Sequence, residues 1–420
     1  MSSMQKSFFL ICFLGVSGWG MGQDSLSLQS LKPITYHFDI THEQLVGAGA
    51  DFLKKVIAKA QFTLLGDYPE SKSSSEFTAA LLPLLDRAEY KTMALGIGVP
   101  SARILGSITK EPTTVVAKLY NWNNTYAFLE NEKTILPMPD MKSVADAQFV
   151  QKAGALEWNI IGFGNESWNN LPWLIDQLYE KLPQELQEKQ RSLYEDCKSR
   201  LKKLYAKRNG DLLLFAEAVA NSKSIQNFLK GVSEKSTENS AIVAAFHNSI
   251  KNCRFYARKQ FFEKNKWRVD EEKRLLRQEL ERVDFDIHQD KLLVKWDMNF
   301  LSRGFQPYAF YGVGNTLSEI AEYNGSTSLH IGIVPRYQLK NGEVQDLMNE
   351  ENTMTHRFAS LMQAAKKDEW TVIDLRKMIQ HSHYTPLKYL LDEPIQDLIK
   401  RYDLIVIPAV EKEARLNYNN

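Results

Sequence analysis

The sequence predicts an α/β protein with a central, mainly parallel or mixed sheet, helices on both faces and a long helical insertion. Short apolar runs with the length of buried strands occur in both halves of the chain. They alternate with stretches whose apolar residues recur at helical spacing. Between residues 171 and 283 such runs disappear, and long charge-rich helical periodicity takes their place.

Strands are predicted where apolar residues form short uninterrupted runs: residues 62–65, 92–97, 158–162, 291–298, 328–334 and 403–408. A helix is expected between the first two runs, because apolar residues recur at helical spacing from Glu76 to Leu85. A strand, helix, strand order favours a parallel crossover, and ligands gather at the carboxyl ends of parallel strands. The stretch from Asp67 to Ser75 is therefore expected on a binding rim.

The first 22 residues have the layout of a secretory signal peptide. Lys6 precedes an apolar run at residues 7–16, and small residues follow at Gly20 and Gly22. The run is shorter than the roughly 20 residues of a membrane-spanning helix, so we expect cleavage near Gln23. The mature protein is expected to be periplasmic or extracellular and to have no transmembrane helix.

The organisation expected from these patterns has four parts: a signal peptide at residues 1–22, a first part of the α/β core at 23–170, the helical insertion at 171–283 and a second part of the core at 284–420. Cys197 and Cys253 remain after signal removal and permit at most one disulfide. Apolar burial must therefore hold the core together.

Charge and motifs argue against nucleic acid and nucleotides as partners. Lys and Arg number 52 and Asp and Glu 51, which leaves a formal charge of +1 and no strong global field. The glycine-bearing turn at residues 311–316 lacks the features of a phosphate loop, and we interpret it as a packing turn. One segment mixes cations with aromatic residues: Arg254, Phe255, Tyr256, Arg258, Lys259, Phe261, Phe262 and Lys264. We expect it to be an amphipathic helix with solvated cations and inward-packed aromatics.

Four segments, taken in order, match a set of hydrolase motifs. Residues 65–69 read Leu-Gly-Asp-Tyr-Pro, and residues 94–98 read Ala-Leu-Gly-Ile-Gly. Residues 161–164 read Ile-Gly-Phe-Gly, and residues 295–304 read Lys-Trp-Asp-Met-Asn-Phe-Leu-Ser-Arg-Gly. Over most of the chain after residue 22, this order resembles the erythromycin esterase-like family, which is related in fold to the TIKI and haem-uptake ChaN proteins.

The motifs of that family read Leu-Gly-Glu-x-His, Ala-x-Glu-x-Gly, Trp-Gly-x-Asp and Lys-x-Gly-x-Asn-His-x-x-Arg-Gly. The resemblance therefore places Pro69 and Phe300 at the two histidines, Gly96 at a glutamate and Gly164 at an aspartate, with Asp67 as a shortened glutamate. It implies hydrolysis by a water that histidine or a metal activates. Proline, phenylalanine and glycine supply neither a base nor a metal ligand.

Several residues remain as candidates for a site. Asp67, Glu70, Asp297 and His330 are the catalytic candidates, and Asp67, Asp297, Asn299, Arg303 and Asn315 are the candidates for ligand binding. Structural roles are open beside these. Asp67 accepting turn amides, Glu70 capping a helix that begins near Ser73, and His330 as a hydrogen-bonded core imidazole would each explain the residue. We expect Arg303 to pair with Asp297, and His381 and His383 to be surface residues on a loop.

The sequence leaves three functions open, and whether the protein is an enzyme is uncertain. The first is an exported, catalytically degenerate esterase-like protein, a pseudoenzyme that binds a small molecule or an envelope partner in the former cleft. The second is an active hydrolase with a site rebuilt from Asp67, Glu70 and Asp297. The third is a structural envelope or surface protein whose cleft Tyr68, Trp296 and Phe300 fill. No cofactor and no metal site are predicted.

Overall fold

The computed structural model describes residues 26–67, 71–130, 133–208, 210–233, 236–306, 309–351, 353–384, 391–412 and 414–418. The predicted signal peptide lies outside these residues, as do Tyr68, Pro69 and Glu70.

A nine-stranded mixed sheet forms the centre of the molecule, in the order β2-β1-β12-β13-β9-β3-β8-β4-β7. The run from β13 to β7 is parallel, whereas β1 pairs antiparallel with β2 and β12, and β12 with β13. The mixed sheet of the prediction is confirmed. The strands are β1 Thr35–Thr41, β2 Gln44–Val46, β3 Phe62–Asp67, β4 Tyr90–Gly98, β5 Phe128–Glu130, β6 Lys133–Ile135, β7 Asn159–Gly164, β8 Lys291–Asp297, β9 Ser328–Ile333, β10 Tyr337–Lys340, β11 Glu343–Asp346, β12 Trp370–Asp374, β13 Leu404–Ile407 and β14 Val410–Glu411.

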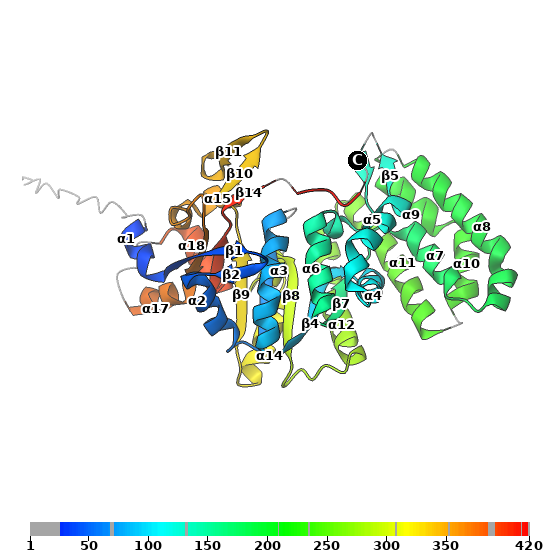
Figure 1. The fold of residues 1–420 in the computed structure, drawn as a ribbon. Coiled ribbons are helices and arrows are strands. Elements are labelled where there is room, and N and C mark those ends of the chain that lie inside the picture. The colour runs from blue at the N-terminus through cyan, green and yellow to red at the C-terminus, as the bar shows by residue number, and fades with distance from the viewer. Residues whose placement is uncertain are drawn as a thin grey trace, which may run out of the picture.

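Helices cover both faces of this sheet (Figure 1). Buried side chains of α2, α3, α4 and α6 form one apolar core with one face, and those of α12 and α14 form another core with the opposite face. The helices are α1 Leu28–Leu31, α2 Ala48–Ile57, α3 Lys72–Arg87, α4 Val99–Ile108, α5 Val115–Tyr126, α6 Val144–Ala155, α7 Leu171–Glu180, α8 Gln184–Ala206, α9 Leu212–Ala220, α10 Lys223–Ser233, α11 Thr237–Ala257, α12 Phe261–Arg282, α13 Met298–Leu301, α14 Val313–Tyr323, α15 Met354–Arg357, α16 Ala359–Met362, α17 Leu375–Tyr384 and α18 Glu393–Arg401, with short 3-10 turns at Lys32–Ile34, Pro112–Thr114, Pro139–Met141 and Leu347–Asn349.

Each predicted strand of the core is present, with ends shifted by one or two residues. Strands β3 and β4 are both parallel to β8, which lies between them. The crossover through α3 therefore skips one position, and a strand from the second part of the core fills it. This interleaving places residues 62–67 beside residues 292–297.

Residues 171–282 form helices α7 to α12 and contain no strand in the part of the chain that the structure describes. Helices α7 to α11 have an apolar core of their own, which includes Trp173, Phe228 and Phe246. This bundle extends beyond the β7 edge of the sheet (Figure 1). Helix α12 differs, because Leu276 and Leu280 pack against the sheet.

The prediction of inward-packed aromatics around the α11–α12 turn is wrong. Tyr256, Phe261 and Phe262 are 45%, 49% and 58% exposed. The turn at residues 258–260 separates two helices, so these rings do not continue one apolar helix face. Arg254 and Arg258 are not simply solvated either, because both pair with Glu217 at 2.6 and 2.8 Å.

Residues 410–412 and 414–418 belong to a C-terminal segment, the C-terminal strap, that runs from β14 toward α5 (Figure 1). At one end, Glu411 accepts hydrogen bonds from Ser71 Oγ at 2.9 Å and from the Ser73 amide at 3.0 Å. At the other end, the Asn417 amide donates to the Lys142 carbonyl at 2.7 Å. The strap thus connects the start of α3 to the turn before α6.

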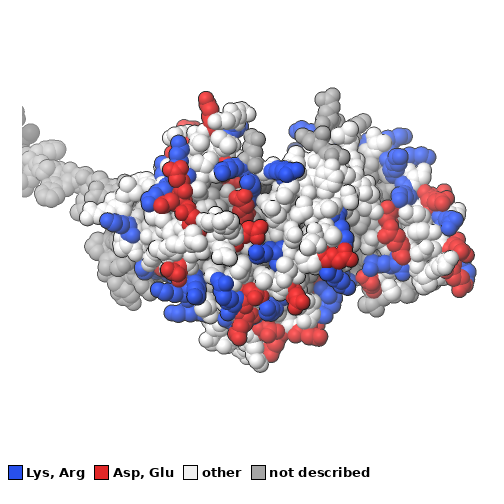
Figure 2. Space-filling view, viewed as in Figure 1, with Lys and Arg blue, Asp and Glu red and all other residues white. Residues whose placement is uncertain are grey.

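Other predictions concern the cysteines, the surface and the membrane. Cys197 and Cys253 are buried and are not joined in a disulfide, and burial raises the pKa of each thiol to about 12. On the face that Figure 2 shows, positive and negative side chains are interspersed. Within the described ranges, no helix is both long and apolar enough to cross a bilayer.

Candidate functional site

A cavity of about 340 Å³ lies at the carboxyl ends of β3, β4 and β8, where the topology of parallel strands favours a ligand site. Its walls combine charged, small and aromatic side chains from both parts of the core and from α12. The lining residues are Asp67, Ser71, Ser75, Leu95, Gly96, Ile97, Asp140, Met141, Lys142, Ser143, Asp146, Arg268, Lys295, Trp296, Asp297, Phe300 and Ala414. Ala414 belongs to the C-terminal strap, which therefore forms part of the cavity wall.

Asp67 and Lys295 form an ion pair on the cavity floor. Asp67 is the last residue of β3, and Lys295 lies two residues before the end of β8, the neighbouring strand. One carboxylate oxygen of Asp67, Oδ2, accepts from Lys295 Nζ, whereas Oδ1 is buried and has no hydrogen-bond partner among the residues that the structure describes. The turn at residues 68–70, whose amides Asp67 was expected to accept in the structural alternative, lies outside the described residues.

Asp297 lies opposite Asp67 in the β3–β8 register. Its Oδ1 accepts the Asn299 amide at 2.7 Å and so caps the short helix α13. Burial raises the pKa of Asp297, and the negative charge of Asp67 acts in the same direction, while the Asn299 amide and Arg268 lower it. The two carboxyl groups therefore share one cavity in different electrostatic surroundings.

A second pair of carboxylates comes from the 3-10 turn before α6 and from the first turn of α6. Asp146 is satisfied by serines: its Oδ1 accepts from Ser75 Oγ at 2.5 Å, and its Oδ2 accepts the Ser143 amide at 2.8 Å. Asp140 as a whole residue is exposed, whereas its carboxyl group faces the cavity wall, and burial of that group raises its pKa to about 6. Lys295 opposes this shift, and the neighbouring carboxylates add to it.

Two stacked aromatic rings form the wall beside β4. The rings of Trp296 and Phe300 lie 4.4 Å apart at an angle of 20°. A Cβ atom on Gly96 would lie 2.0 Å from Cγ of Trp296, so the indole occupies the space that a side chain at position 96 would need. A Cβ on Gly164 would lie 2.3 Å from the backbone oxygen of Gly96. Neither glycine position can hold a carboxylate in this arrangement.

Arg268 closes this aromatic wall from α12. Its guanidinium carbon lies 3.9 Å from the centre of the Phe300 ring, a cation–π contact. Its Nε lies 3.2 Å from Oε1 of Glu272, one helical turn further on. Glu272 is 1% exposed, and burial raises its pKa to about 8 despite the attraction of Arg268.

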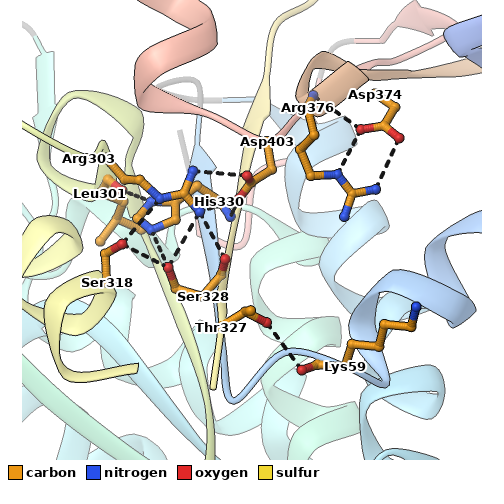
Figure 3. Close-up of polar contacts among 10 residues, drawn as sticks. All are labelled: Lys59, Leu301, Arg303, Ser318, Thr327, Ser328, His330, Asp374, Arg376 and Asp403. Atoms are coloured by element: carbon orange, nitrogen blue, oxygen red, sulfur yellow. Dashed lines mark hydrogen bonds and ion pairs between the residues drawn. The ribbon is translucent and has the colours of Figure 1, made fainter. Parts of the chain in front are cut away.

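The remaining candidates do not line the cavity. Arg303 pairs with Asp403 at 2.5 Å rather than with Asp297, so that expected pair is absent. His330 is fully buried (Figure 3): Nδ1 lies 2.7 Å from the Leu301 carbonyl and Nε2 lies 3.1 Å from Ser328 Oγ. Burial, supported by the charge of Arg303, holds the pKa of His330 well below its usual value. This is the core imidazole of the structural alternative.

Asn299 and Asn315 also face other surroundings. Asn299 borders a separate pocket beside Arg357 and Arg401. Asn315 Oδ1 accepts the Gly304 amide at 2.8 Å, and Asn315 Nδ2 donates to Glu319 at 2.8 Å. These contacts stabilise the turn that precedes α14.

Two further expectations concern residues at helices α3 and α17. Helix α3 begins at Lys72, and Ser71 is its N-cap, since Ser71 Oγ accepts the Ser74 amide at 3.1 Å. Glu411 also accepts the Ser73 amide, whereas the alternative in which Glu70 caps this helix falls on a residue outside the described ranges. His381 and His383 belong to helix α17 and not to a loop.

The arrangement offers hydrogen-bond acceptors and cations but lacks a built metal site. Within the described residues, no group of three or more His, Cys, Asp or Glu side chains is placed to hold a metal ion. Asp67 and Asp297 are the carboxylates that the sequence identified and the structure brings together. Lys295, Arg268 and Asp140 were missed as site residues.

Similarity to known proteins comes from structure. The sequence matches no protein-family model and no curated protein. The structure is similar to a histidine-to-asparagine mutant of erythromycin esterase EreC in its open conformation, with a TM-score of 0.55, 12% identity and coverage of 90% of this chain and 97% of that one. The chain has the erythromycin esterase-like fold.

Two other solved structures share this fold. A protein described as a succinoglycan biosynthesis protein has a TM-score of 0.53 and 11% identity, over 92% of this chain and 97% of that chain. A protein from Bacillus cereus has a TM-score of 0.51 and 12% identity, over 92% of this chain and 98% of that chain. At these identities, the likeness establishes the fold and leaves the chemistry to the side chains.

Proposed function

We propose that this protein is an exported ligand-binding protein that keeps the erythromycin esterase-like fold without its hydrolytic reaction. The observation that carries the proposal is the Trp296–Phe300 stack in the cavity. Phe300 stands where the resemblance expects a histidine, and Trp296 fills the space beside Gly96, where it expects a glutamate. An aromatic hydrocarbon ring and a glycine exchange no proton with water, so the hydrolytic pair is missing.

The free space beside the stack favours a ligand over a filled cleft. A volume of about 340 Å³ is at the lower end of the range for small-molecule sites. A buried acceptor without a partner costs about 1–3 kcal/mol, so Asp67 Oδ1 gains from a donor that a ligand brings. We therefore infer a small ligand with an amino or hydroxyl group directed at Asp67 and an apolar face directed at Trp296.

Turnover is the first test of this proposal. Erythromycin and p-nitrophenyl acetate serve as probes for the purified protein, with Asp67→Asn and Asp297→Asn variants in parallel. We expect no hydrolysis above the buffer rate for any of the three proteins. If the wild type hydrolyses a probe and either variant does not, the protein is a hydrolase and the binding proposal is wrong.

The second candidate function is a hydrolase with a rebuilt site. One observation favours it: Asp67 and Asp297 are register partners in one cavity, and the pKa of Asp297 is raised. Two carboxyl groups in unlike surroundings are the arrangement that acid–base catalysis uses. This site would work without His330, which is buried elsewhere, and the turnover assay decides between the two functions.

Ligand chemistry is tested by thermal denaturation with glucosamine and glucose as probes. A ligand that binds only the folded state raises the unfolding temperature. We expect glucosamine to raise it more than glucose, and the difference to vanish in the Asp67→Asn variant, which loses the acceptor charge. Equal responses of the wild type and the variant would contradict the role given to Asp67.

Export is tested on the intact gene product. The motivating observation is the Lys6-led apolar run before Gln23. Expression in a bacterium, fractionation and N-terminal sequencing should recover a periplasmic or extracellular chain that begins near Gln23. A chain that stays in the cytoplasm with Met1 or Ser2 at its terminus would refute this part of the proposal.

A further inference from the structure

Exposed aromatic side chains gather around the α11–α12 turn and the neighbouring loop that follows α13. We call this set the aromatic corner; its members are Tyr256, Phe261, Phe262, Phe305 and Tyr311, which are 45–58% exposed. Single exposed apolar residues are common, whereas a cluster of large ones marks an interaction surface.

Ring contacts connect the corner. The centroids of Tyr256 and Phe261 lie 6.1 Å apart. Phe262 contacts Phe310 at 5.1 Å, and the backbone of Phe310 accepts the Gln306 amide at 2.9 Å. Phe305 and Tyr311 lie 5.5 Å apart and form an isolated β-bridge. The Phe262–Phe310 contact therefore joins the start of α12 to the loop that carries Phe305 and Tyr311.

Cations lie beside the α11–α12 part of the corner. The ammonium group of Lys264 lies 5.4 Å from the ring centre of Tyr256 and 5.9 Å from that of Phe261. Lys259 and Lys266 are exposed. Between residues 254 and 268, Glu263 is the one acidic residue among several lysines and arginines. Even with Arg254 and Arg258 paired to Glu217, the corner carries excess positive charge.

We propose that the aromatic corner docks on the surface of an anionic lipid bilayer. Tyrosine and phenylalanine rings enter the interfacial layer, where aromatic residues are enriched, and lysines beside them meet anionic headgroups. A bilayer surface requires no matching groove, so exposed rings with neighbouring cations are sufficient for docking. A single-stranded nucleic acid would need a positively charged groove along its backbone, and the charge of the chain is close to zero.

Docking would also orient the candidate site. Phe261 and Arg268 belong to the same helix, α12, and are seven residues apart. This separation corresponds to about 10 Å along the axis. Since Arg268 lines the cavity, a docked corner holds the cavity within a few residue lengths of the bilayer surface. Ligands that carry a lipid or partition into membranes would reach it at raised local concentration.

Vesicle sedimentation tests the proposal with the chain that begins at Gln23, because the apolar residues before it would bind lipid by themselves. Probes are vesicles of phosphatidylcholine with one third phosphatidylglycerol and vesicles of phosphatidylcholine alone. We expect binding to the anionic vesicles that weakens with added salt and falls at least about tenfold on neutral vesicles. Phe261→Ser with Phe262→Ser, and separately Lys259→Glu with Lys264→Glu, should each weaken anionic binding about tenfold or more.

Matched controls separate the corner from general effects. Tyr323→Ser removes an 86% exposed aromatic elsewhere, and Lys202→Glu with Lys203→Glu changes the charge by the same amount on α8. Both controls should bind like the wild type, and circular dichroism should show every variant folded. Equal binding to neutral vesicles, or full binding by the Phe261→Ser and Phe262→Ser variant, would overturn the proposal. Absence of vesicle binding by the wild type would also overturn it. In that case, a dimer or an oligonucleotide complex that the Phe261→Ser and Phe262→Ser variant no longer forms would identify the partner of the corner instead.

Discussion

Two polar clusters lie in the same sheet and differ in how far their atoms are paired. The Arg303 cluster consists of Arg303, Ser318, Ser328, His330 and Asp403 (Figure 3). In it, Arg303 donates to both carboxylate oxygens of Asp403, at 2.9 and 2.5 Å, and both ring nitrogens of His330 have partners. The Asp67 cluster consists of Asp67, Asp140, Lys295 and Asp297 and, among the described residues, leaves Asp67 Oδ1 without a partner beside a cavity.

The difference separates stability from function. Buried polar groups whose hydrogen bonds are complete hold a unique packing and have nothing to offer a ligand. A buried acceptor that the fold leaves unpaired makes the empty state less stable and favours a bound donor. The candidate residues from the sequence belong to both clusters. The completeness of their hydrogen bonds distinguishes the structural cluster from the one that can bind a ligand.

The largest expected effect comes from breaking the complete cluster. Arg303→Met leaves Asp403 buried without its cation and should lower the free energy of unfolding by about 3 kcal/mol or more. Urea denaturation measures it. Arg277→Met, which removes an exposed pair with Glu281, is the matched control and should cost less than about 0.5 kcal/mol. Equal losses in the two variants would show that the cluster is no stronger than a surface pair.

A methyl group on the cavity wall tests whether Trp296 occupies the space beside position 96. Gly96→Ala places a Cβ against the indole and should cost about 1–3 kcal/mol, because the ring must move. In a Trp296→Ala background the same change should cost little. A double-mutant cycle by urea unfolding gives this coupling, and additive losses would place the ring elsewhere.

The acid behind the aromatic wall should make stability depend on pH. The pKa of Glu272 is raised from 4.5 to about 8, so the folded state binds more protons than the unfolded state between these values. Stability is therefore greatest below pH 4.5 as far as this group is concerned, and it is lost as the pH rises toward 8. We expect the free energy of unfolding of the wild type to fall by about 1–3 kcal/mol more between pH 5 and pH 8 than that of the Glu272→Gln variant.

Denaturation curves of the wild type and of Glu272→Gln at several pH values make this measurement. Glu271→Gln is the control, since Glu271 pairs with exposed Arg274 on the same helix. Parallel pH profiles for the wild type and Glu272→Gln would mean that Arg268 keeps Glu272 ionised.

The smallest effect is expected at Asp297. Its raised pKa means that ionisation destabilises the folded state above its unfolded pKa, and the penalty disappears as the pH falls below it. Asn caps helices as well as Asp does, so Asp297→Asn should raise stability at pH 7 by less than about 1 kcal/mol. The gain should vanish near pH 3. A loss at pH 7 would show that the charge of Asp297 is needed by a neighbour such as Arg268.

The sequence predicted the core strands because each is a buried apolar run that no other element explains. It missed three strands of the nine-stranded sheet, β1, β2 and β12, where polar and apolar residues mix, as in Thr35–Thr41. These strands extend one edge of the sheet through antiparallel pairing, and β1 and β12 pair with partners that lie far away in the sequence. The exposure of the aromatic side chains at the α11–α12 turn was missed for a related reason. Aromatic residues suggest burial, but these lie at the ends of two helices, where their side chains are exposed to solvent.

The site was predicted only in part because spacing does not show which side chains share a wall. Asp67 and Asp297 end neighbouring parallel strands, so their meeting follows from topology. Lys295 gave a signal that could have been used, since a charge directly after the apolar run Leu292–Val294, inside a central strand, needs a partner. Asp140 and Arg268 gave no such signal in the sequence. They reach the cavity from a turn and from a helix that are far in sequence from the ends of β3 and β8.

The C-terminal strap has a consequence for the order in which the protein is completed. Every strand of the nine-stranded sheet is supplied by residues up to Ile407, yet one wall of the cavity contains Ala414. The sheet and both flanking layers can therefore form without the strap, whereas the cavity wall is complete only when the strap has packed against it. During folding, a ligand could enter the cavity before the strap is in place.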